Sequence, residues 1–115
     1  MEDEPKNLKE CFEYLDRELD PEDIEKIKSL KNRNETFMFH FGLGMGLRNS
    51  LGLWGGSKLA EYLRERDFMI HPDDMSGLIL KYYYDWLHGN HRNWKRFDKK
   101  KPKKRGFGLD PPDLD

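Results

Sequence analysis

Large apolar residues are concentrated in the middle of this chain, and that distribution limits where a hydrophobic core can form. Phe, Leu, Met, Tyr and Trp are frequent from residue 35 to 88, whereas charged residues dominate both ends. Charged residues make up 37% of the sequence and apolar residues 36%, which is low for a globular domain. We therefore expect one small compact domain formed by residues 1–90 and a flexible tail, first basic and then acidic, formed by residues 91–115.

Apolar residues recur at three- and four-residue steps in four segments, and each segment follows a residue that can cap a helix. These segments begin after Asn7, Asp20, Ser57 and His71. The segment after His71 has the strongest pattern, and a left-handed turn at Gly89 or Asn90 is expected to end it. Each of the four is predicted to be an α-helix.

Residues 37–47 are compatible with two structures. Large apolar residues occupy every odd position, a period of two that is typical of a strand, and three interior glycines disfavour a helix by about 1 kcal/mol each relative to alanine. A strand, however, needs a partner, and no other segment provides one. We favour a buried helix from Thr36 to Asn49, in which Gly42 and Gly46 let a second helix approach. The fold class is thus predicted to be all-α, with about five helices.

Two polar motifs stand out in the middle of the chain. Residues 40–49 read His-Phe-Gly-Leu-Gly-Met-Gly-Leu-Arg-Asn, followed by Gly-Leu-Trp at 52–54, and residues 71–76 read His-Pro-Asp-Asp-Met-Ser. At this spacing the pair resembles a family of small bacterial proteins of unknown function. The resemblance covers residues 8–88 and implies a bacterial origin and a compact, mainly helical domain, but no activity. Gly46 departs from the family's pattern, which has a larger residue there.

The polar and aromatic residues of these motifs form one candidate cluster. Its members are His40, Arg48, Asn49, Trp54, His71, Asp73 and Asp74. Because a buried arginine needs a carboxylate, we predict that Arg48 pairs with Asp73 or Asp74. This pair would join the segment of residues 36–49 to the helix that follows His71. His71 and the two acids are also the minimum for metal binding or acid–base catalysis, but acids at a helix start are usually caps. We therefore assign no catalytic, metal or cofactor site.

The single cysteine, Cys11, excludes an internal disulfide, and its apolar neighbours indicate a buried thiol. The acidic first residues lack the basic start and the apolar stretch of a signal peptide. No run approaches the roughly 20 apolar residues of a membrane span. We therefore expect a cytoplasmic protein that does not contact a membrane.

Charge is divided unevenly along the chain. Residues 1–90 carry 12 basic and 18 acidic residues, a net charge of −6, whereas residues 91–115 carry nine basic and four acidic residues, a net charge of +5. The candidate binding residues of the tail are Arg92, Trp94, Lys95, Arg96, Lys99, Lys100, Lys101, Lys103, Lys104 and Arg105. This composition fits a nucleic-acid-binding arm through residues 91–105 or a solvated tail that aids solubility.

Three classes of function are compatible with these observations. We favour a non-enzymatic protein-interaction module, such as an immunity-like or adaptor protein with a protein partner. The first alternative is a nucleic-acid-associated accessory protein that uses the basic tail. The second is a small enzyme or metal protein centred on His71, Asp73 and Asp74.

Overall fold

The computed structural model describes residues 4–67 and 71–100, and this part of the chain is helical, with no strand. The helical segments are α1 (Leu8–Glu18), α2 (Pro21–Lys28), the 3-10 helix η1 (Arg33–Phe39), α3 (Leu43–Ser50), α4 (Lys58–Arg66), α5 (Pro72–Leu87) and α6 (Arg92–Asp98). The predicted all-α class is confirmed. The described ranges hold seven helical segments, however, and not about five.

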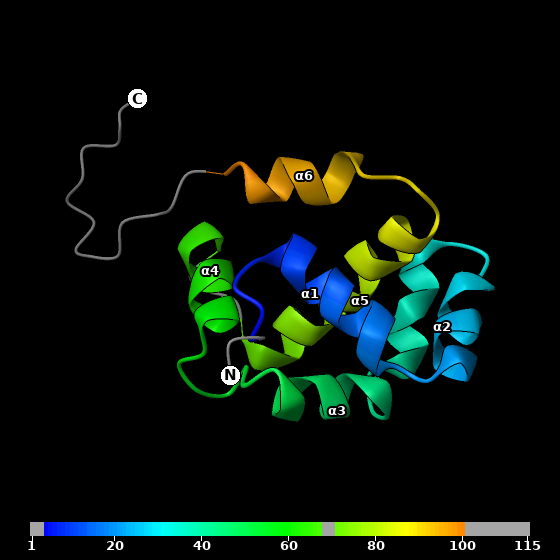
Figure 1. The fold of residues 1–115 in the computed structure, drawn as a ribbon, viewed down its shortest axis with the longest axis horizontal. Helices are drawn as coiled ribbons and strands as arrows, with labels where there is room; N and C mark the ends of the chain where they lie inside the picture. The colour runs from blue at the N-terminus through cyan, green and yellow to red at the C-terminus, as the bar shows by residue number, and fades with distance from the viewer. Residues whose placement is uncertain (1–3, 68–70, 101–115) are drawn as a thin grey trace.

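Helix α5 is the central element of the fold, and the other six segments all pack against it (Figure 1). Its buried side chains include Met75, Ile79 and Tyr83, which recur at four-residue steps. The ring of Phe12, from α1, lies 5.9 Å from that of Tyr83 and 5.3 Å from that of Trp86, between centroids. The strongest helical pattern in the sequence thus forms the centre of the core.

The predicted helix starts are confirmed, although the side chain of Asp20 forms no capping hydrogen bond at the start of α2. The side chain of Asn7 accepts a hydrogen bond from the backbone N–H of Glu10 at 2.9 Å, and the Ser57 hydroxyl accepts one from Ala60 at 3.1 Å. Gly89 adopts a φ of +74° directly after α5, in the left-handed region that favours glycine. Local sequence therefore sets where these helices begin and end.

The predicted helix from Thr36 to Asn49 is wrong, because a turn divides this stretch into η1 and α3. Gly42 has φ −87° and ψ −84°, outside the helical region, and α3 begins only after it. The stretch is also only partly buried: Leu47 and Arg48 are 3% and 4% exposed, but Phe37 and Phe41 are 72% and 77% exposed. The interior glycines weaken a continuous helix, and two short segments allow η1 and α3 to contact α5 at different angles.

Close approach in this region occurs at a different glycine from the two predicted. A Cβ atom at Gly44 would lie 3.3 Å from the carbonyl oxygen of Phe39 and 3.4 Å from Nη1 of Arg48. At Gly42 and Gly46 the same position has no neighbouring atom within 4 Å. Gly44 is therefore the residue that lets η1 and the Arg48 side chain pack tightly.

The predicted flexible tail does not begin at residue 91, because residues 92–98 form α6. Trp94 and Phe97 on this helix are each 4% exposed, and the Trp94 ring meets Phe12 edge to face at 5.5 Å. Two apolar residues three apart among many charges form a narrow stripe, which is sufficient to attach a short helix to the core. The candidates Lys101, Lys103, Lys104 and Arg105 lie outside the described residues.

Candidate functional site

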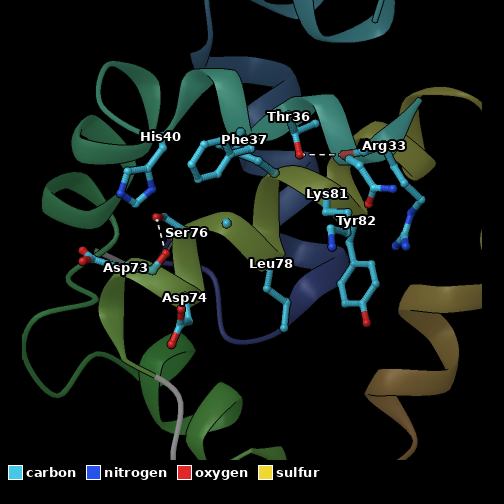
Figure 2. Close-up of a pocket in the computed structure, with 13 residues that line it drawn as sticks. Arg33, Thr36, Phe37, His40, Asp73, Asp74, Ser76, Leu78, Lys81 and Tyr82 are labelled. Carbon is cyan, nitrogen blue, oxygen red and sulfur yellow. Dashed lines mark hydrogen bonds between the residues drawn. The ribbon is translucent and has the colours of Figure 1, made fainter. Parts of the chain in front are cut away.

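A groove of about 450 Å³ separates η1 from the first half of α5. Figure 2 shows Phe37 and His40 along one side of it, and Asp73, Asp74 and Leu78 along the other. The structure therefore brings His40 together with the two acids, although more than 30 positions separate them in the sequence.

Arg48 supports this groove from within the protein. Its Nη1 donates a hydrogen bond to the hydroxyl of Ser76 at 2.8 Å, and its Nε lies 3.3 Å from Oδ1 of Asp73. The arginine side chain is only 5% exposed, whereas that of Asp73 is half-exposed. The predicted bridge between Arg48 and the start of α5 is confirmed, with Asp73 as the acid. It is a single contact and not the bidentate pair that arginine can form.

Replacing Arg48 with methionine is expected to lower the free energy of unfolding by about 1–2 kcal/mol, because the Ser76 hydroxyl loses its donor. The loss is limited, since water can solvate the half-exposed Asp73 once its partner is gone. Urea denaturation measures this difference. The exposed Arg17 provides a control: Arg17→Met is expected to change stability by at most about 0.5 kcal/mol. Equal stabilities for the two variants would contradict the structural role of Arg48.

His71 and Asp74 begin helix α5. Nδ1 of His71 accepts a hydrogen bond from the backbone N–H of Asp73 at 3.1 Å, and Asp74 accepts one from the backbone N–H of His71 at 3.4 Å. This reciprocal arrangement is a capping box, and Trp54 contacts the His71 ring edge to face at 5.9 Å. Across residues 4–67 and 71–100, no three His, Cys, Asp or Glu side chains are placed to hold a metal ion.

Two further candidates lie outside the groove. Asn49 is exposed on α3 and borders a different depression, together with Tyr14 and Gly52. Cys11 is fully buried in the core, and burial raises the pKa of its thiol to about 12. A neutral, buried thiol is a poor nucleophile, so Cys11 acts as a small core residue, as predicted.

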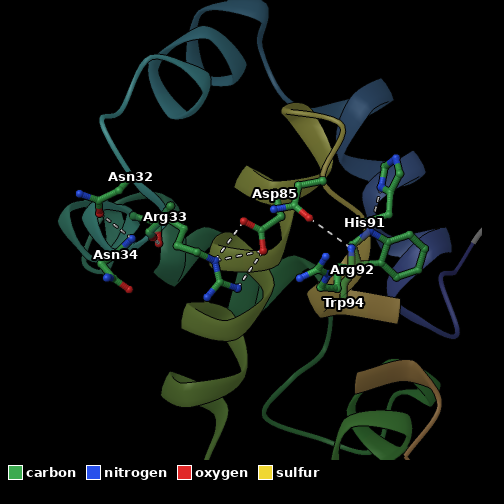
Figure 3. A network of polar contacts seen from close by, with 9 residues as sticks. Asn32, Arg33, Asn34, Asp85, His91, Arg92 and Trp94 are labelled. Carbon is green, nitrogen blue, oxygen red and sulfur yellow. Dashed lines mark hydrogen bonds and ion pairs between the residues drawn. The ribbon is translucent and has the colours of Figure 1, made fainter. Parts of the chain in front are cut away.

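An ion pair with a buried carboxylate attaches η1 to α5, and it was not predicted from the sequence. Nε of Arg33 lies 3.0 Å from both carboxylate oxygens of Asp85, and Nη2 lies 2.8 Å from one of them (Figure 3). Asp85 is 2% exposed. The amide oxygen of Asn32 accepts a hydrogen bond from the backbone N–H of Asn34 at 2.9 Å, which starts η1 and places Arg33. An acid among the aromatic residues of α5 was the signal that could have revealed this pair.

A second polar contact to α5 was missed for the same reason. Asp16 on α1 accepts hydrogen bonds from the Tyr83 hydroxyl at 2.8 Å and from the Trp86 indole at 3.0 Å. Burial and the contact with Asp16 raise the pKa of Tyr83 above its ordinary value, so this hydroxyl remains a donor. The polar groups of Tyr83 and Trp86 on α5 therefore have hydrogen-bond partners within the fold.

The exposed surface around the groove is unusually apolar. Five large apolar side chains are at least half exposed among the described residues: Phe37, Met38, Phe41, Met45 and Trp54. The His40 ring lies 5.7 Å from that of Phe37 and 5.0 Å from that of Phe41, so these three rings form a cluster that we call the aromatic edge. An exposed apolar surface of this kind commonly marks a binding site.

The described part of the chain is a small, all-helical domain with exposed apolar side chains beside a groove. The chain belongs to the family described as "Domain of unknown function (DUF6794)", whose profile matches residues 4–87. The match spans both sequence motifs and ends at the last residue of α5, so α6 lies beyond it. Membership of an uncharacterised domain family is thereby confirmed, and the bacterial origin stays a prediction. No curated protein and no solved structure matches the chain.

In the two described ranges, no helix combines the length and the apolar content needed to cross a bilayer.

Proposed function

We propose that this protein is a non-enzymatic protein-interaction module, of the adaptor or immunity type, that binds a partner protein through the aromatic edge and the adjoining groove. The observation that carries the proposal is the exposure of Phe37 and Phe41, at 72% and 77%, beside a core in which Phe12 and Phe97 are 0% and 4% exposed. The two residues belong to the stretch where the sequence concentrates its apolar residues, and the fold leaves them at the surface.

The energetics favour a binding role for these side chains. Burying an aromatic side chain removes roughly 150–250 Å² from water, which contributes a few kcal/mol at about 25 cal/mol per Å². In the free domain Phe37 and Phe41 are exposed, so they do not contribute this free energy to folding. A partner that covers Phe37 and Phe41 would gain it, and aromatic residues commonly dominate the binding energy of interfaces.

The groove indicates the character of the partner's surface. Its walls are partly apolar, from Phe37 and Leu78, and its polar border holds the exposed carboxylate of Asp74 and the partly exposed Lys81. We therefore favour a partner that inserts apolar side chains between η1 and α5 and surrounds them with polar residues of both charges.

The double substitution F37S/F41S is expected to weaken partner binding by more than tenfold, because truncating hot-spot aromatic residues commonly costs about 2 kcal/mol or more. The experiment is quantitative affinity purification from the native host with wild-type and variant proteins, followed by calorimetry with the purified partner. Thermal stability should be retained, since both rings are mostly exposed.

The matched control is E22S/E25S, which changes two exposed residues of α2. It should bind the partner as the wild-type protein does. A partner that both variants retain equally would contradict the proposed surface. Sedimentation velocity tests whether a second copy of the chain occupies this surface. A wild-type dimer that is absent in F37S/F41S would contradict the proposal of a different partner protein.

A further inference from the structure

Helix α6 presents a cationic face that is separate from the aromatic edge. Arg92, Lys95, Arg96, Lys99 and Lys100 are all exposed. Their spacing of three and four residues places their backbone positions on one side of the helix, opposite the buried Trp94 and Phe97. The Nζ atoms of Lys95 and Lys100 lie 5.9 and 5.4 Å from the ring centroids of Trp94 and Phe97, at the two borders of this face. The backbone N–H groups of Lys99 and Lys100 still bond to Lys95 and Phe97, so the last two cations continue the same turn. What the sequence suggested to be a flexible arm is here an ordered array.

Several contacts fix the orientation of this array. The Trp94 indole donates a hydrogen bond to Nδ1 of His91 at 3.0 Å (Figure 3). Asp98, the acidic residue of α6, accepts hydrogen bonds from the Tyr62 hydroxyl at 2.6 Å and, through its carbonyl, from Arg66 at 3.1 Å. Its charge is therefore turned toward α4 and away from the cationic face. In the described part of the chain, none of the five cations forms an ion pair.

Helix stability alone does not explain these cations. Lys95 and Arg96 in the last turn complement the negative end of the helix dipole. Arg92 is the first residue of α6, where a positive charge is unfavourable, and the first turn contains no acid. The five cations are therefore not accounted for by the stability of α6, and they present their charge to solvent.

We propose that the cationic face of α6 binds the phosphate backbone of double-stranded nucleic acid without reading its sequence. Duplex DNA carries one negative charge per about 1.7 Å, a density that a rigid row of cations can match. Trp94 and Phe97, the aromatic residues that would stack on unpaired bases, are buried in the core. Single strands thus gain no stacking, which favours a duplex.

The same face is poorly suited to an acidic protein. Protein interfaces generally contain an apolar centre, and the large exposed apolar residues of the described chain all lie between residues 37 and 54, none of them on α6. A surface that offers a row of charges without an apolar anchor fits a rigid polyanion of high charge density, as a nucleic-acid duplex is. This inference does not depend on the proposed protein partner.

The test is fluorescence anisotropy of a labelled 20-base-pair DNA duplex with the full-length protein over a range of salt concentrations. Five phosphate contacts predict a slope of about −4 to −5 for the logarithm of the association constant against that of salt. The variant R92Q/K95Q/R96Q should reduce the slope by about 3 and raise Kd more than tenfold at low salt. Its melting temperature should be unchanged, because the three side chains are exposed.

Two further variants locate the binding site. K26Q/K28Q/K31Q removes the same charge from exposed positions in and after α2 and should bind the duplex as the wild-type protein does. K101Q/K103Q/K104Q removes three cations that follow α6 in the sequence. Loss of binding in this last variant alone, with R92Q/K95Q/R96Q unaffected, would overturn the proposal.

Two competitor polyanions test the identity of the ligand. A single-stranded oligonucleotide of the same length should bind more weakly than the duplex, because the aromatic rings are inaccessible. Polyglutamate of matched charge should also bind more weakly. Equal or tighter binding of either competitor, or no duplex binding at low salt, would overturn the assignment.

Discussion

Replacing Arg33 with methionine is expected to lower the free energy of unfolding by about 2–4 kcal/mol, because the buried Asp85 carboxylate loses its cation; the Arg33 side chain is 30% exposed, so the loss is smaller than for a fully buried ion pair. Asp85 is 2% exposed, so its carboxylate would remain in the core without a cation. For a chain of this size the melting temperature should fall by roughly 10–20 °C. Urea denaturation and a thermal melt both measure the effect.

The double variant R33M/D85L separates charge from packing. Buried ion pairs replaced by apolar residues of similar volume often retain stability, so this variant should recover most of the loss. A double variant as unstable as R33M would show that the charge of Asp85 is not the cause. Because Arg33 attaches η1 to α5, R33M should also lower the affinity for any partner that binds through Phe37 and Phe41.

Replacing Trp94 with alanine is the second large effect, with an expected loss of about 3–5 kcal/mol. Trp94 is 4% exposed and contacts the rings of Phe12 and Trp86, at 5.5 and 5.9 Å between centroids. The substitution leaves a cavity between α6 and the core. Helix α6 should therefore separate from the rest of the domain before the domain unfolds globally. Hydrogen exchange should show early loss of protection in residues 92–98, and urea denaturation gives the total cost.

The control for this variant is Arg92→Ala, an exposed substitution in the same helix. Its effect on stability is expected to be at most about 0.5 kcal/mol, since no packing is lost. Equal stability of Trp94→Ala and the wild-type protein would contradict the inclusion of α6 in the cooperative domain. It would also remove the ordered support on which the cationic face depends.

The two proposed binding surfaces belong to different parts of the molecule. In the view of Figure 1, α6 lies along the top, and α3, which begins two residues after Phe41, lies along the bottom, with α5 between them. A partner protein on the aromatic edge would therefore leave the cationic face free for a polyanion. If both proposals hold, the protein can bring a protein partner to nucleic acid, which is the role of an adaptor.

Much of the local structure could be predicted from the sequence because it depends on neighbouring residues. Asn7 and Ser57 cap helices through hydrogen bonds that span three residues, and Gly89 ends α5 through its own backbone conformation. The link between Arg48 and Asp73 was also predictable, because a buried arginine requires an acid and the motif after His71 offered two.

Only the tertiary structure decided which apolar residues are buried. Phe37 and Trp94 both lie in stretches that pattern alone misassigned: the first was expected in the core, and the second in a flexible tail. Arg33 and Asp85, 52 positions apart, meet only because η1 folds onto α5. Caps and periodicity are properties of a few adjacent residues, whereas burial depends on which segments meet. This chain offers more apolar surface than its small core can cover, and the packing around α5 determines which of it remains exposed.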